Sequence, residues 1–307
     1  MTSKRPYIVG FGIACIDYIV VAPAVEPGGH TYIESYTTQG GGLTGTAIVA
    51  ASRLGARAKF LGRIGDDDIG SQVIESLNVE NVDASDLIKV PGAKSLFSWV
   101  LVDTQTAERT IYCRKDQNIE CSTDLIALNS IKGADALLLD AHWPEGARAA
   151  AKKAREIGVP VVSDIKVHYP DITDLLALCD YPIISQSSAL NFAGSSDHYG
   201  ALAKIRSFGP KAVVITCGEN GAYYADNSGQ GHVPAFKVDA IDTTGAGDVF
   251  HGAFAIGLAM GWNLRDIVTF SSAVSAIKCT KIGGRAGIPT FAETINFLTQ
   301  QGLHLNA

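Results

Sequence analysis

The chain has 307 residues, of which 47% are hydrophobic and 18% are charged, and its net charge is −6. This composition predicts an enzyme with one large core and argues against nucleic acid or an anionic membrane as the main partner. No uncharged apolar run reaches the ~18 residues of a membrane span, no secretory leader is recognisable, and six scattered cysteines without a Cys-x-x-Cys pair indicate reduced thiols, so we expect a cytoplasmic protein.

Short β-rich runs dominate the first third of the chain. The predicted strands are 7–11, 15–21, 32–38, 59–64, 96–103 and 110–114, and the predicted helices are 44–54 and 69–77. Strands within about 15–40 and 95–115 fall outside any strand–helix rhythm. We therefore expect some of them to form a small sheet that closes over a bound substrate and excludes water.

The remainder of the chain alternates strands with helices. The predicted strands are 136–139, 159–163, 181–185, 212–216, 222–225 and 232–238, and the predicted helices are 147–157, 172–178, 199–208, 246–260, 264–278 and 291–300. This alternation predicts βαβ units around a parallel sheet, which the strand pair at 222–238 interrupts.

The most informative stretch is Asp-Thr-Thr-Gly-Ala-Gly-Asp at 242–248, directly before a helical pattern. The amides of Gly245, Ala246 and Gly247 lie at a helix start, where unpaired N–H groups bind phosphate well. Asp248 falls in the first turn beside them. Amides that hold a phosphoryl group, next to a carboxylate that accepts a proton, suit phosphoryl transfer to an alcohol.

Several other residues have two interpretations. Gly10-x-Gly12 is a weak dinucleotide-binding signal, because the third glycine is missing. The glycine run 40–42 is either a flexible turn or backbone that approaches a hydroxylated ligand closely. Asp17 either faces solvent or accepts hydrogen bonds from sugar hydroxyls. Arg285 stands in a glycine-rich loop that either reaches a phosphate or faces solvent.

Residues 41–56, 62–70 and 242–252 resemble the two motifs of the ribokinase-like (PfkB) carbohydrate kinases, in the family's order. The resemblance covers essentially the whole chain. It implies a single doubly wound α/β domain, residues 1–307, with a mostly parallel sheet and a small β-sheet lid. It also implies transfer of the γ-phosphate of ATP to a sugar hydroxyl with Mg²⁺, and we expect a homodimer formed through the lid.

The resemblance assigns roles to individual residues. Asp248 matches the base, and the three residues before it match the anion hole that holds the phosphoryl group. Further matches are, for the sugar, Asp17, Gly41 and Gly42; for the nucleotide, Thr216, Gly218, Gly221, Thr244 and Gly247; and for a monovalent cation such as K⁺, Asp242 and Thr244 with carbonyls near 278–287. Thr46 stands at a sugar-binding position where many members carry asparagine.

The chain also departs from the family. Residues 185–188, Ser-Gln-Ser-Ser, replace an Asn-x-x-Glu motif, so we expect Mg²⁺ to be held mostly by water and phosphate. Leu43 stands where ribokinase has lysine, which argues against a ribokinase. The C-terminal half is most similar to the sulfofructose kinase branch.

That branch binds a sulfonate through three residues that correspond to His30, Cys113 and His142 here. Two histidines and a cysteine suit an anionic sulfonate poorly. We therefore expect a small neutral ketose or related sugar as substrate. A sulfosugar, a nucleoside, a non-catalytic sugar-binding role and a dehydrogenase remain as alternatives.

Overall fold

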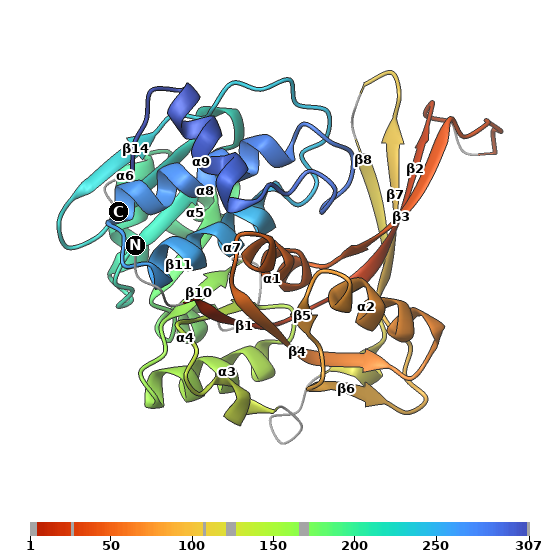
Figure 1. Cartoon of the computed structure of the whole chain (residues 1–307), viewed down its shortest axis with the longest axis horizontal. Coiled ribbons are helices and arrows are strands. Elements are labelled where there is room, and N and C mark those ends of the chain that lie inside the picture. The colour runs from red at the N-terminus through yellow and green to blue at the C-terminus, as the bar shows by residue number, and fades with distance from the viewer. Residues whose placement is uncertain (1–4, 26–27, 107–108, 121–126, 166–171, 306–307) are drawn as a thin grey trace.

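The computed structural model describes residues 5–25, 28–106, 109–120, 127–165 and 172–305. Within them, the main sheet contains β1 Tyr7–Phe11, β4 Arg57–Gly65, β5 Val82–Asp83, β6 Leu87–Val90, β9 Ala136–Asp140, β10 Val161–Asp164, β11 Tyr181–Ser185, β12 Val213–Thr216, β13 Ala222–Ala225 and β14 Gln230–Val233. Their order is β14-β13-β12-β11-β10-β9-β1-β4-β5, with β6 paired to β4 (Figure 1). Neighbours from β12 to β6 run parallel, whereas β13 and β14 are antiparallel.

Helices cover both faces of this sheet. They are α1 Leu43–Arg53, α2 Asp68–Asn78, α3 Pro144–Glu156, α4 Ile172–Leu176, α5 Gln186–Ala193, α6 His198–Arg206, α7 Ala246–Ala259, α8 Leu264–Lys278 and α9 Phe291–Gln300, with short 3₁₀ turns at Gln117–Ile119, Leu128–Ile131 and Gly218–Asn220. Alternate residues of each strand enter opposite cores. In β1, Ile8 belongs to the core that also contains residues of α1, α7 and α8, whereas Val9 and Phe11 belong to the opposite core, with residues of α3 and α6.

A second sheet projects from the main body, at the right of Figure 1. It consists of β2 Cys15–Ala22, β3 Ser35–Gly41, β7 Phe97–Asp103 and β8 Arg109–Arg114, in the order β3-β2-β7-β8. The β2–β7 pair is parallel and the other two pairs are antiparallel. The register places Asp17, Ser98 and Cys113 side by side on one face of this sheet and Tyr18, Trp99 and Tyr112 on the other face.

The predicted fold class is confirmed: a doubly wound α/β body with a mostly parallel sheet and a small second sheet. The sequence missed α5 and the short strands β5 and β6. The strand expected at 32–38 lies at Ser35–Gly41, because pairing of Gly41 with Cys15 draws the glycines into the ladder. The strand expected at 232–238 ends at Val233, because Pro234 has no N–H for a ladder hydrogen bond.

Candidate active site

The first turn of α7 faces open space on one side, although the Ala246 amide already donates to the Thr243 carbonyl at 3.2 Å. Gly245 is the N-cap and has φ 73°, a left-handed conformation that glycine adopts without strain. A Cβ added at Gly247 would have no neighbouring atom within 4 Å, so this part of the turn faces open space. Asp248 lies in the same turn. The sequence-predicted cluster of three amides and one carboxylate is therefore assembled at one helix start, where the helix dipole favours an anion.

Asp242 fixes the loop that precedes this helix. Its carboxylate accepts hydrogen bonds from the backbone N–H of Thr244 at 2.8 Å and of Gly283 at 2.7 Å. Burial alone would raise the pKa of Asp242, but these hydrogen bonds lower it below its ordinary value. The hydroxyl oxygen of Thr244 is buried and has no hydrogen-bond partner among the described residues. Asp242 thus ties residues 242–245 to the loop after α8.

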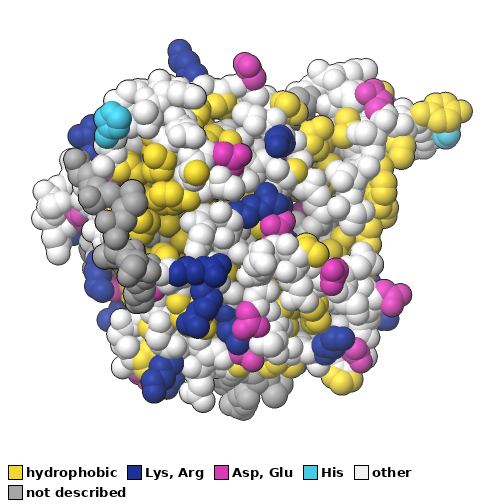
Figure 2. Space-filling view, in the orientation of Figure 1, with side chains coloured by type: hydrophobic (Ala, Val, Ile, Leu, Met, Phe, Trp, Pro, Cys, Tyr) yellow, Lys and Arg dark blue, Asp and Glu magenta, His cyan; other side chains and the backbone are white. Residues whose placement is uncertain are grey.

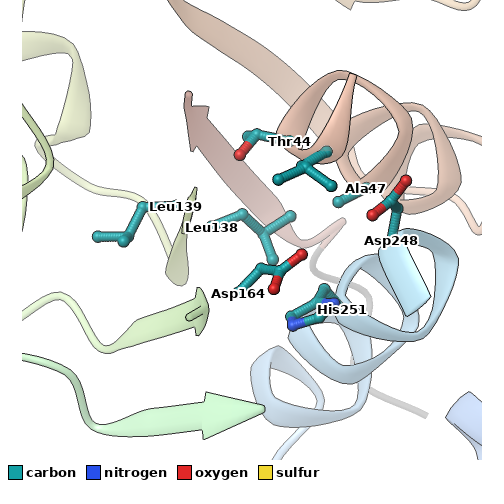
Figure 3. A pocket seen from close by; sticks show the side chains of 8 residues that line it. Thr44, Ala47, Leu138, Leu139, Asp164, Asp248 and His251 are labelled. Atoms are coloured by element: carbon teal, nitrogen blue, oxygen red, sulfur yellow. The ribbon is translucent and has the colours of Figure 1, made fainter. Parts of the chain in front are cut away.

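A pocket of about 190 Å³ lies beside this helix start, between α1, β9, β10 and α7 (Figure 3). Thr44, Leu138, Asp164, Asp248 and His251 contribute to its lining. The imidazole of His251 lies 2.6 Å from the Gly247 carbonyl through Nδ1, and is buried. His251 therefore stabilises the first turn of α7. The sequence did not single out Asp164, which reaches the pocket from the carboxyl end of β10.

Asp17 and the glycine run meet at the junction of the two sheets. Asp17 is buried, burial raises its pKa, and the Cys15 thiol donates to its Oδ1 at 3.3 Å. A Cβ at Gly41 would lie only 2.0 Å from Asp17 Oδ2, and one at Gly42, where φ is 87°, would lie 2.5 Å from the Ile13 carbonyl. This supports the close-approach interpretation of the glycines over a flexible turn.

Asp140 was missed as a structural anchor. It is fully buried at the end of β9, where its carboxylate accepts from the backbone N–H of Ile13 at 2.9 Å and of His142 at 3.0 Å, and from the Thr44 hydroxyl at 2.7 Å. Burial raises its pKa, while these hydrogen bonds act to lower it. A Cβ at Gly12 would collide with this carboxylate. Packing alone therefore requires glycine at this position, and a dinucleotide-binding role is not needed to explain it.

The second sheet contacts the loop before α7 and the loop after α8. Arg285 donates from Nη2 to the Gly41 carbonyl at 2.9 Å, and the Gln39 amide donates to the Ile282 carbonyl at 3.2 Å. On β8, Arg109 donates to the Thr243 hydroxyl at 2.7 Å. Of the two interpretations of Arg285, exposure to solvent is wrong: the side chain is buried, and burial lowers its pKa to about 10. The burial of Arg285 depends on contacts with residues that are distant in the sequence, so its glycine-rich neighbours do not predict it.

The residues expected to line the nucleotide lie at the carboxyl edge of the main sheet. Thr216 ends β12 and pairs with Ser185 of β11, so the Ser-Gln-Ser-Ser segment begins beside it. Gly218 and Gly221 have φ 56° and 87° and bound a tight turn. A Cβ at Gly221 would lie 2.1 Å from the Val233 carbonyl. This edge is where ligands of open α/β sheets gather.

The remaining sugar-site candidates are dispersed. Thr46 is buried in α1, and a Cβ at Gly284 would lie 3.8 Å from its hydroxyl, close to the loop after α8. Cys113 lies across Ser98 from Asp17, with its sulfur 3.6 Å from the Ser98 hydroxyl. His142 follows β9 and is half-buried. His30 is exposed, and its ring contacts Tyr32. Neither Cys113 nor His142 is among its described contacts.

Among the described residues, no group of three or more His, Cys, Asp or Glu side chains is placed to hold a metal ion. Asp164 and Asp248 nevertheless line one pocket. One or two carboxylates suffice for Mg²⁺, which keeps several waters and binds substrate phosphates. The residues present therefore fit Mg²⁺ that arrives with a nucleotide. No helix in the described part of the chain combines the length and apolarity needed to cross a membrane.

Comparisons with known proteins agree with this geometry. The profile of the pfkB family carbohydrate kinases matches residues 5–291. The chain is 29% identical to a ribokinase of Staphylococcus aureus over 95% of this chain and 99% of that protein, and 27% identical to the probable fructokinase-3 of Arabidopsis thaliana over 98% and 93%. A crystal structure of ribokinase from Thermotoga maritima superposes with a TM-score of 0.84 at 27% identity, over 96% of this chain and 99% of that one.

Proposed function

Because the chain belongs to the pfkB family of carbohydrate kinases, we propose that it transfers the γ-phosphate of ATP to a hydroxyl, preferably primary, of a small ketose or related sugar. One observation carries this proposal. The start of α7 faces open space at Gly247, and Asp248 stands in the same turn. A pure sugar-binding protein has no use for that carboxylate, and the missing third glycine after Gly10-x-Gly12 argues against the dinucleotide site of a dehydrogenase.

In the proposed reaction, the sugar lies against Asp17 and the glycine pair Gly41-Gly42. Its hydroxyl oxygen attacks the γ-phosphorus, a new P–O bond forms, and the bond to the β-phosphate oxygen breaks, so ADP leaves. Asp248 accepts the hydroxyl proton, and the amides of 245–247 donate hydrogen bonds to the transferred group. When bound, Mg²⁺ neutralises phosphate charge, and the carboxylates of Asp164 and Asp248 are placed to hold it directly or through water.

We propose that the second sheet is a lid. The contacts Arg285–Gly41, Gln39–Ile282 and Arg109–Thr243 join it to the loops around the anion hole. A sheet linked to these loops excludes water from the transferred phosphoryl group, as a kinase requires to avoid hydrolysing ATP. The chain then acts as one domain with a lid made by strands within 15–40 and 95–115.

A homodimer through this lid is also proposed. The sheet face opposite Asp17 carries large apolar side chains, and Tyr36, Trp99, Leu101 and Tyr112 are each more than 40% exposed. Figure 2 shows apolar side chains along the outer edge of this sheet. Contiguous exposed apolar surface of this kind commonly marks a protein interface.

The relatives support a pentose or hexose substrate, because they are named ribokinase and fructokinase. His30, Cys113 and His142 favour a neutral sugar over a sulfonate, whereas the resemblance to sulfofructose kinase keeps the sulfosugar as the alternative. An ADP-release assay with fructose, ribose, sulfofructose and adenosine distinguishes these substrates. Consumption of ATP with none of them would contradict the proposed substrate class.

Asp248→Asn tests the proposed base, with Asp66→Asn at an exposed position as the matched control. We expect the Asp248 variant to lose about three or more orders of magnitude in kcat while ATP binding, followed by calorimetry, changes little. The control keeps the parental rate. Near-normal turnover of Asp248→Asn would show that another group accepts the proton.

A further inference from the structure

Lys278, the last residue of α8, is a buried cation that the proposed mechanism has not used. Its side chain has no exposed surface, and its ammonium donates to the Asp242 carbonyl at 2.9 Å. None of the salt bridges between described residues includes it. Burying a charge costs free energy unless polar or charged groups compensate it. A buried ammonium beneath the 242–247 loop therefore indicates a specific role for Lys278.

Lys278 interacts electrostatically with the carboxylates next to the proposed anion hole. Burial lowers its pKa, while the negative charges of Asp242 and Asp248 act in the opposite direction. An ammonium has three N–H donors, and the Asp242 carbonyl accepts one of them. The carbonyl ends of α8 also favour a cation at this position. Lys278 thus places a positive charge inside the protein, close to the carboxylates that border the phosphoryl site.

The last turn of α8 supports the backbone of that loop directly. The Cys279 carbonyl accepts from the N–H groups of Ile241 at 2.8 Å and Asp242 at 3.1 Å, and the Ser275 hydroxyl donates to the Ala246 carbonyl at 2.8 Å. Together with the ammonium of Lys278, these contacts attach residues 241–246 to α8 at several points. The amides of the anion hole therefore depend on this turn for their position.

The same contacts do not fit a resident monovalent cation at Asp242 and Thr244. Both Asp242 carboxylate oxygens already accept backbone N–H groups, and its carbonyl accepts from the ammonium of Lys278. A second cation at these oxygens would lie beside a buried positive charge and be repelled by it. The internal ammonium and an added K⁺ are therefore alternatives for one role.

We propose that Lys278 is a positioning residue whose ammonium acts as a built-in cation: it holds the 242–247 backbone in place through the Asp242 carbonyl and makes phosphoryl transfer independent of added monovalent cations. This inference rests on the proposed kinase function. Lys278 touches neither substrate, so its effect falls on kcat through the geometry of the anion hole.

The test compares the parental enzyme with Lys278→Met, Lys278→Ala and the control Lys281→Met, which removes an exposed lysine three residues away. Turnover is measured with tetramethylammonium, Na⁺ or K⁺ chloride at constant ionic strength. We expect the parent and control to vary less than about twofold among these salts, and Lys278→Met to lose about tenfold or more in kcat with a similar sugar KM. In Lys278→Ala, which leaves space, K⁺ should restore part of the rate.

Thermal unfolding provides a readout that does not require turnover. K⁺ relative to tetramethylammonium should raise the Tm of Lys278→Ala by about 2 °C or more, but leave the parent unchanged, because only the variant offers a vacant cation position. Selective stabilisation or severalfold activation of the parent by K⁺ would overturn the proposal, as would Lys278 variants with parental kcat or a loss in Lys278→Ala that no cation restores. A parent inactive on every sugar would refute the kinase function alone, since the Tm comparison still decides the role of Lys278.

Discussion

Replacement of Gly41 by alanine tests whether the carboxylate of Asp17 holds the sugar. The added Cβ would lie 2.0 Å from Asp17 Oδ2 and 2.5 Å from its Cγ. An ordinary contact needs about 3.4 Å or more, so the carboxylate must retreat by about 1.4 Å. Gly41 does not have a positive φ, so the substitution adds this collision without backbone strain.

A displacement of ~1 Å at a positioning group can cost about 100-fold in rate, which corresponds to ~2.7 kcal/mol of transition-state stabilisation. We therefore expect Gly41→Ala to lower kcat/KM for the sugar about 100-fold, mainly through KM, and to leave the KM for ATP within about twofold. Steady-state kinetics with each substrate varied in turn measures both effects. Gly200→Ala, at an exposed position early in α6 where the nearest atom to the new carbon is 3.1 Å away, is the matched control and should keep parental constants.

The reasoning would be refuted if Gly41→Ala kept the parental sugar KM and kcat while circular dichroism and the Tm confirmed a folded protein. Asp17 would then lie outside the sugar site, because no carboxylate could tolerate this carbon without moving. A parallel loss in the KM for ATP would instead indicate that the whole lid junction had shifted.

Three further outcomes are expected. Asp140→Ala leaves the buried N–H groups of Ile13 and His142 without their acceptor, and should lower the free energy of unfolding in urea by about 3–5 kcal/mol; a loss under about 1 kcal/mol would show that water or a shifted backbone compensates. Burial raises the pKa of Asp17, so this carboxylate is protonated at a higher pH than an exposed aspartate. In the pH profile, the kcat/KM for the sugar should therefore fall on acidification with an apparent pKa above 3.8, and Asp17→Asn should abolish this fall. For stability the sign is opposite: between the ordinary and the raised pKa the folded state binds more protons at Asp17, so the contribution of this residue declines as pH rises. Trp99→Asp places a charge on the exposed face of the second sheet and should convert a dimer to a monomer in sedimentation velocity; an unchanged sedimentation coefficient would exclude this face as the interface.

Much of the fold follows from local patterns. Alternation of strand and helix between residues 136 and 216 predicted the parallel sheet, because parallel neighbours require a helical crossover between them. The helices at Leu264–Lys278 and Phe291–Gln300 match their predicted bounds, since each begins after a side chain that caps it, Asn263 or Thr290. The cluster at the start of α7 could also be predicted from the sequence, because the glycines and the carboxylate of the proposed anion hole are adjacent in the chain.

The rest of the site depends on residues that are distant in the chain. The sequence left open whether Asp17 and Arg285 face solvent or a ligand, and it assigned no structural role to Asp140 or Lys278. Arg285, Asp140 and Lys278 each have a hydrogen-bond partner from another part of the chain: Gly41 for Arg285, Ile13 for Asp140 and Asp242 for Lys278. Backbone propensity and hydrophobic periodicity act over a few neighbouring residues, so they can be predicted from the sequence. The burial of a charge depends instead on which distant donors and acceptors lie next to it in the folded chain.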